Sequence, residues 1–147
     1  MTRTIAQIEE WLESGTRAAD PLEHAGELVK AGEEVLENWI MAHGGTPTDE
    51  TRENFRLLAL HRQGAKGDPS FNACRETCRE IAYHYNLVKL EAAEGRGQDS
   101  VAMMRLVTKH LVLFIGGKLK EAGLGDFCCS SRSLRSKPDR KVDYLGV

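Results

Sequence analysis

The sequence predicts an all-α fold, namely a four-helix bundle of long helices with a short N-terminal helix and an irregular C-terminal tail. Apolar residues recur every three or four positions through most of the chain. No segment alternates strictly between apolar and polar residues, and no long unit repeats, which disfavours sheets and solenoids. The 147 residues, of which 41% are hydrophobic and 29% charged, suit one globular domain with its own core.

The first expected helix is short and covers residues 4–14. Thr4 and Gln7 have the spacing of a capping box, in which two side chains bond the free backbone amides of the first turn. Gly15 is a typical residue at which a helix ends. One side of this segment is apolar and carries Ile5, Ile8, Trp11 and Leu12. We therefore expect a short amphipathic helix that packs on the longer ones.

The second expected helix opens at Asp20-Pro21, where the aspartate caps the helix and the proline takes its first position. It ends before Gly44-Gly45. Its apolar stripe consists of Ala25, Leu28, Val29, Val35, Leu36, Trp39 and Ile40. The acidic residues Glu27, Glu34 and Glu37 are expected on the opposite, solvent-facing side.

The third expected helix begins at Thr46-Pro47-Thr48-Asp49, which repeats the same order of cap, proline and acid. It ends before Gly64 and Gly67. Its apolar residues are Phe55, Leu57, Leu58 and Leu60.

The fourth expected helix starts at Asp68-Pro69 and continues to about Glu94. One of its faces carries Phe71, Cys74, Cys78, Ile81, Ala82, Tyr85 and Val88, and a second, narrower stripe consists of Tyr83, Leu87 and Leu90. The fifth helix, from Val101 to about Ala122, is apolar nearly all round and is expected at the centre of the bundle. The helix phases predict a set of deeply buried residues: Trp39, Phe71, Ile81, Tyr85, Val107, His110, Leu111 and Phe114.

Helical periodicity stops near residue 123, so we expect a helical bundle domain over residues 1–123 and an irregular basic tail over residues 124–147. Between positions 130 and 141 the tail has five basic residues and one acid. These cations could dock on an acidic protein surface or on nucleic-acid phosphates, and they are Arg132, Arg135, Lys137, Arg140 and Lys141. The alternative is a solvated tail without a partner.

Four cysteines form the first candidate chemical site: Cys74, Cys78, Cys128 and Cys129. Residues four apart on a helix point the same way, so the first two could supply half of a zinc, Fe–S or thiol-redox site that the other two complete. The alternative is that Cys74 and Cys78 act as small apolar core residues, because both lie within an apolar helix face.

Carboxylates form the second candidate site. Glu33-Glu34-x-x-Glu37 is followed by Glu50-x-x-Glu53. This spacing resembles the acidic helices of the all-α nucleoside triphosphate pyrophosphatases, the MazG-like family. The resemblance implies a Mg²⁺ ion held by these carboxylates against a triphosphate. It covers only residues 33–53, and Glu53 stands where that family has aspartate. A solvated acidic helix face is the alternative.

No complete catalytic signature is present, so the sequence favours a non-enzymatic interaction or regulatory module, such as an adaptor or a small subunit of a larger complex. Lys and Arg number 20 against 22 Asp and Glu, which leaves no global field to attract nucleic acid or an anionic membrane. No signal peptide or membrane span is expected, which favours a cytoplasmic protein. The stripe Tyr83, Leu87 and Leu90 is the expected partner surface, and self-association as a dimer is expected.

Overall fold

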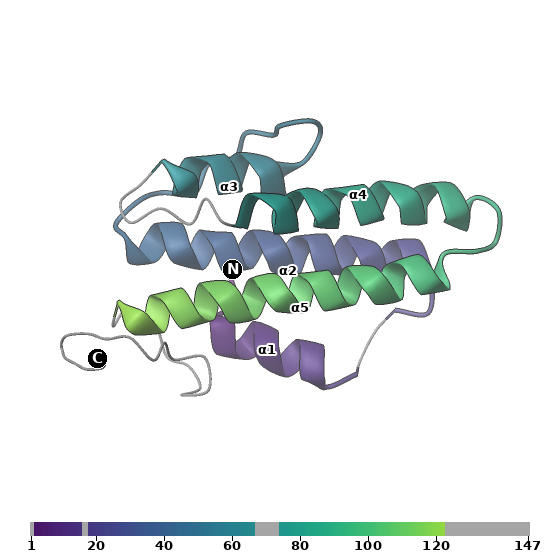
Figure 1. Cartoon of the computed structure of the whole chain (residues 1–147), viewed down its shortest axis with the longest axis horizontal. Helices are drawn as coiled ribbons and strands as arrows, with labels where there is room; N and C mark the ends of the chain where they lie inside the picture. Colours follow the sequence, from purple (N-terminus) through teal and green to yellow (C-terminus); the bar gives the residue numbers. More distant parts are fainter. Residues whose placement is uncertain (1, 16–17, 67–73, 123–147) are drawn as a thin grey trace.

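A computed structural model describes residues 2–15, 18–66 and 74–122 (Figure 1). The described chain forms five α-helices that pack together, so the all-α prediction is confirmed, whereas a four-helix bundle is not. The helices are α1 (Ile5–Glu13), α2 (Pro21–Ala42), α3 (Arg56–Ala65), α4 (Arg75–Ala92) and α5 (Gln98–Glu121). The expected basic tail, Cys128, Cys129 and Phe71 lie outside the described residues.

The central helix is α2, which packs against all four of the others. The fifth helix was expected at the centre, and this expectation is wrong: α5 packs on α1, α2 and α4, and one of its faces is exposed. Figure 1 shows α2 and α5 running in the same direction, with α4 antiparallel to both. The helix α1 lies on the α5 side of α2, and α3 lies beside α2 and α4.

The caps predicted for the first two helices are confirmed. The Gln7 amide donates to Thr4 Oγ1 at 3.1 Å, and the Thr4 amide donates to Gln7 Oε1 at 2.9 Å, which completes the capping box. At the start of α2, the Glu23 amide donates to Asp20 Oδ2 at 2.9 Å, and Pro21 occupies the first turn. Both caps use residues three apart, so local sequence is enough to specify them.

The start of the third helix differs from the prediction, because α3 begins at Arg56 and the segment from Thr46 is not helical. A tight turn precedes α3. Glu53 and Asn54 have φ angles of 53° and 72°, and Arg52 and Phe55 exchange two backbone hydrogen bonds of 2.9 Å. This left-handed backbone cannot belong to an α-helix. The turn places Arg56 at the first position of α3.

Gly32 on α2 is the point at which four helices meet. A Cβ built on Gly32 would lie 3.1 Å from a methyl carbon of Leu57 on α3, 3.7 Å from one of Leu111 on α5 and 3.8 Å from one of Ile81 on α4. All three neighbours are fully buried. Glycine at this position therefore lets α3 approach α2 closely, and the core is built around it.

The predicted core is confirmed in part. Trp39, Ile81 and Leu111 are buried, whereas three predicted residues are only partly buried: Tyr85, Val107 and Phe114. The prediction for His110 is wrong, because its side chain is exposed. It lies on the side of α5 opposite to the buried line that faces α2, which comprises Met104, Thr108, Leu111 and Ile115.

Of the helices that the structure describes, α5 has the length and composition that could cross a membrane, with a mean hydropathy of 1.3 in its most apolar window. Half of that window is buried inside the protein. Core helices of soluble proteins have the same length and composition, so this property does not identify a membrane span.

Replacing Leu111 by alanine is expected to lower the free energy of unfolding by about 2–5 kcal/mol, because it leaves a cavity beside Gly32 in the tightly packed centre. The matched control is Leu90→Ala on α4, a residue that is 70% exposed, which should change it by less than about 0.5 kcal/mol. Urea unfolding followed by circular dichroism measures both. Equal losses would contradict the orientation of α5.

Candidate functional site

The carboxylates of α2 are buried, which contradicts the expectation that Glu34 and Glu37 face solvent. Their residues are 3% and 8% exposed. Since α2 is surrounded by other helices and the N-terminal segment, it has little surface left for charge. Buried carboxylates need cationic or hydrogen-bonding partners, and each of these two has an arginine from a different part of the chain.

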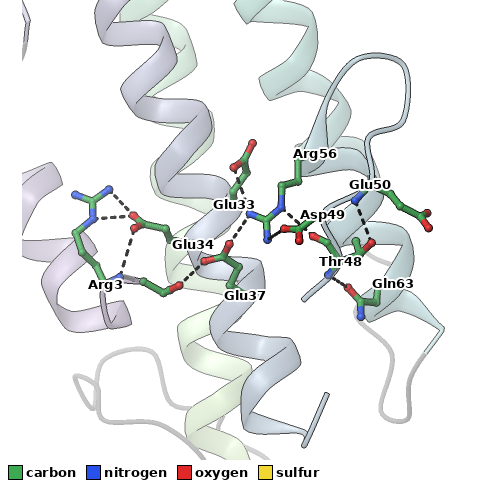
Figure 2. A network of polar contacts seen from close by, with 10 residues as sticks. Arg3, Glu33, Glu34, Glu37, Thr48, Asp49, Glu50, Arg56 and Gln63 are labelled. Carbon is green, nitrogen blue, oxygen red and sulfur yellow. Dashed lines mark hydrogen bonds and ion pairs between the residues drawn. The ribbon is translucent and has the colours of Figure 1, made fainter. Parts of the chain in front are cut away.

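Glu34 is bound by Arg3 (Figure 2). Arg3 Nε donates to Glu34 Oε1 at 2.7 Å, and a terminal guanidinium nitrogen lies 2.6 Å from the same oxygen. The Asn38 amide group donates to the backbone carbonyls of Arg3 and Glu34 at 2.7 and 2.8 Å. These contacts hold the segment before α1 against the middle of α2.

Glu37 is bound from two sides. The Thr2 hydroxyl donates to Glu37 Oε1 at 2.6 Å, and Arg56 donates to Oε2. The same guanidinium nitrogen of Arg56 lies 3.6 Å from Glu33 Oε1, one turn earlier on α2. Figure 2 shows Arg56 between α2 and the segment before α3. One arginine therefore neutralises two glutamates on neighbouring turns of α2.

Arg56 also fixes the non-helical segment between α2 and α3. Its Nε donates to the Thr48 carbonyl at 2.8 Å, and its other terminal nitrogen lies 3.8 Å from Asp49 Oδ1. From α3, Gln63 accepts from the Thr48 amide at 2.8 Å and donates to the Thr46 carbonyl at 2.7 Å. These bonds satisfy the backbone without a helix, which explains why α3 begins later than predicted.

Burial and charge act in opposite directions on the α2 carboxylates. Burial raises the pKa of Glu33, and the nearby charges of Arg56 and Lys30 offset this only in part. Burial also opposes ionisation of Glu37, but the hydrogen bonds from Thr2 and Arg56, together with the charge of Arg56, outweigh it and lower the pKa of Glu37. Glu37 is therefore the carboxylate that depends most on Arg56 in its charged form.

The acidic residues that resemble the pyrophosphatase pattern do not form one site in this structure. Glu33 and Glu37 point at Arg56, whereas Glu53 lies in the turn before α3 and pairs with Arg79 at 3.2 Å. Glu50 is exposed and not helical. Within the described ranges, no group of three or more histidine, cysteine, aspartate or glutamate side chains has a metal-binding arrangement. These residues do not fit a Mg²⁺ ion, because a guanidinium already lies where the α2 carboxylates converge.

Cys74 and Cys78 are both buried with free thiols. Burial raises the pKa of Cys74 to about 12, against a small opposing effect of Lys118, and burial raises the pKa of Cys78 further. Metal binding and thiol exchange both use the thiolate. The described pair therefore has the properties of apolar core residues. Because Cys128 and Cys129 lie outside the described residues, the complete four-cysteine site stays a prediction.

The predicted apolar stripe on α4 is largely exposed. Tyr83 is 62% exposed and Leu90 is 70% exposed, whereas Leu87 is partly buried. The predicted docking residues of the tail, from Arg132 to Lys141, lie outside the described residues, so their role stays a prediction.

Sequence patterns did not identify Arg3 and Arg56 as important, because their glutamate partners are 31 and 19 residues away. They also missed His24, which is 2% exposed. His24 Nδ1 lies 3.0 Å from Glu27, and its Nε2 lies 3.3 Å from Arg105 on α5. The sequence does contain one indication that His24 is buried, because this polar residue lies next to the apolar stripe of its helix.

Comparisons with known proteins found no match to this chain among family models, curated proteins or solved structures.

Replacing Arg56 by glutamine is expected to lower the free energy of unfolding by about 1–3 kcal/mol, because it leaves the Glu37 carboxylate without its cation. The loss in free energy of unfolding of the double variant Arg56→Gln/Glu37→Gln should be smaller, by at least about 0.5 kcal/mol, than the losses of the two single variants added together. The two effects are not additive because the residues are in direct contact. Urea unfolding at pH 7 measures the cycle.

The matched control for this cycle is Arg79→Gln, whose partner Glu53 has a side chain that is 54% exposed. An exposed ion pair contributes less than about 1 kcal/mol. A loss for Arg56→Gln no larger than that for Arg79→Gln would show that the Arg56 network stabilises the fold no more than an exposed ion pair does.

The two buried thiols are expected to make the protein less stable in alkali. In the unfolded chain a cysteine ionises near its usual pKa of 9.0, whereas the folded protein keeps these thiols protonated. Above about pH 9 the unfolded state therefore binds fewer protons than the folded state. Each of the two thiols should then lower the free energy of unfolding by about 1.4 kcal/mol for every pH unit. Urea unfolding under reducing conditions from pH 7.5 to 10.5 measures this fall.

The control for the alkaline series is Cys74→Ala/Cys78→Val, which keeps every other titrating group. Its stability should fall less steeply with pH than that of the native protein. Identical slopes would mean that the two cysteines ionise as easily in the folded protein as in the unfolded chain.

Proposed function

We propose that this chain is a non-enzymatic helical interaction module that binds a second copy of itself through the outer face of α5. The observation that carries this proposal is a row of exposed apolar side chains on that helix. Met103, Leu106 and Leu113 are 49%, 64% and 44% exposed. Large exposed apolar side chains grouped on one helix face are typical of interfaces.

These three residues lie on one face of α5. A step of three residues turns an α-helix to within roughly 60° of its starting direction, and a step of seven to within roughly 20°. Met103, Leu106 and Leu113 are separated by such steps, and the exposed His110 lies among them. Val107 and Phe114, both partly buried, border the row on one side. The exposed Lys109 borders the row on the other side. The outer face of α5 is thus mostly apolar over about three turns.

The outer face is suited to pairing with itself in antiparallel orientation. Leu106 and Leu113 lie equally far from the midpoint between positions 109 and 110, and so do Asp99 and Lys120. A two-fold axis at that midpoint would place Leu106 of one copy against Leu113 of the other. The same axis would place Asp99 near Lys120 at both ends of the contact. Such a symmetric arrangement with complementary charges is what a homodimer interface requires.

The stripe Tyr83, Leu87 and Leu90 and the basic tail remain proposed contacts for a different protein partner, which would suit an adaptor or a small subunit. Neither alternative function has comparable support. A metal or thiol site would need thiolates, whereas burial raises the pKa of Cys74 and Cys78. A nucleotide pyrophosphatase would need converging carboxylates, whereas Glu37 is bound to Arg56.

Leu106→Glu is expected to convert a dimer into a monomer, because it places a charge against Leu113 of the other copy at two points of the α5 contact. Light scattering after gel filtration measures the molar mass of the full chain. A concentration of about 10–100 µM is high enough to populate a dimer with a micromolar dissociation constant. The matched control is Leu90→Glu on α4, which should leave the dimer intact. A native monomer would contradict the proposal, as would a dimer that Leu90→Glu disrupts and Leu106→Glu does not.

A charge exchange tests the antiparallel register. Asp99→Lys should weaken the dimer, and Asp99→Lys/Lys120→Asp should restore it, because the pairing between the two ends is recovered with reversed sign. Circular dichroism confirms that each variant is folded. A double variant that is no more dimeric than Asp99→Lys would contradict the register.

A separate measurement is sedimentation of the native protein with lipid vesicles. A native monomer that sediments with the vesicles would assign the outer face of α5 to membranes and contradict the proposed dimer.

A further inference from the structure

A shallow depression beside the start of α4 is lined by positive charge. Its volume is about 490 Å³, and it lies between the turn before α3, the outer side of α3 and the first turns of α4. Its described charged lining consists of Arg52, Arg62, Lys66, Arg75 and Arg79, and its other described lining residues are the buried His61 and the apolar Leu58 and Ala65. Among the described residues that line it, none is a carboxylate.

The positive charge of this depression is poorly balanced. Arg79 pairs with Glu53 at 3.2 Å. With the residues that the structure describes, Arg52, Arg62, Lys66 and Arg75 form no ion pair. Cations that line the same depression repel one another and favour a bound anion.

The start of α4 adds a second, independent reason for anion binding. Arg75 occupies the first position of α4, where the helix dipole disfavours a cation and favours an anion. Cys74 precedes it at the cap position and makes no side-chain cap hydrogen bond. An anion bound by Arg75 in the depression would lie near the amino end of an 18-residue helix, where the helix dipole favours negative charge.

We propose that this depression binds a small polyphosphate anion, that is, a ligand with two or more linked phosphate groups. Guanidinium groups bind phosphate oxygens in pairs, and four arginines from three segments of the chain can surround such a group from several sides. A depression of this size suits a small ligand. The site lies away from the outer face of α5, so this inference is independent of the proposed dimer.

The test uses inorganic tripolyphosphate and orthophosphate as probes for the full chain in a buffer of low ionic strength, followed by calorimetric titration. Tripolyphosphate should bind saturably to the native protein and at least about tenfold more tightly than orthophosphate, because it contacts more cations. It should also raise the melting temperature, since it binds the folded state. Absence of saturable binding would overturn the proposal.

The variant Arg62→Gln/Arg75→Gln should bind tripolyphosphate about tenfold more weakly or worse. The matched control is Lys89→Gln/Arg96→Gln, which removes the same charge at the other end of α4 and should change the affinity by less than about twofold. Equal weakening by both pairs would mean that only net charge matters, which would overturn the proposed site.

Two further measurements keep the test decisive. Without ligand, Arg62→Gln/Arg75→Gln should melt no lower than the native protein, because it relieves repulsion and removes a cation from a helix start. If it does not fold, Arg52→Gln in the exposed turn takes its place, with an expected weakening of about fivefold. A single-stranded oligonucleotide that binds more tightly than tripolyphosphate and loses affinity in the same variant would assign the surface to nucleic acid and overturn the small-ligand proposal.

Discussion

The structure depends on the burial of α2 among four other helices. A helix in that position buries most of its surface, including the positions of Glu34 and Glu37. A buried carboxylate is unfavourable unless cations and hydrogen bonds compensate its lost hydration. Arg3 and Arg56 supply this compensation from opposite sides of α2. The need to pair these charges therefore fixes the segment before α1 and the segment before α3, two parts of the chain with little regular structure of their own.

The Arg56 network links the fold to the candidate surfaces. Because Arg56 binds Glu37 and the Thr48 carbonyl together, it holds the segment that leads into the turn containing Arg52. That turn forms one wall of the basic depression, and α3 and α4 form the others. The acidic residues of α2 thus contribute to the molecule as structural anchors, while the residues with unbalanced charge lie on the outside of α3 and α4. Because Arg3 and Arg56 already bind the α2 carboxylates, these carboxylates do not form a metal site, although their spacing in the sequence resembles one.

The position of α2 also determines the surface of α5. With α2 at the centre, α5 buries one face against α2, α1 and α4 and leaves the other exposed. An apolar helix exposed on one side can satisfy that side by contacting another molecule, which is the basis of the proposed self-association. The two proposed contact regions lie on different helices, the apolar one on α5 and the basic one between α3 and α4. Binding at one does not require the residues of the other.

The sequence by itself determined the helical class and the first two helix starts, because these depend on contacts between residues three or four positions apart. The caps at Thr4 and Asp20 are of this kind. Tertiary structure decided the late start of α3, the pairing of Glu34 and Glu37, and the exposure of His110. Each of these features depends on residues far away in the chain or on which side of a helix its neighbours cover. Local periodicity contains no information about either of these two causes. An apolar helix such as α5 has the same sequence pattern whether it is surrounded or lies at the edge, so only the packing around α2 could show that one of its faces is exposed.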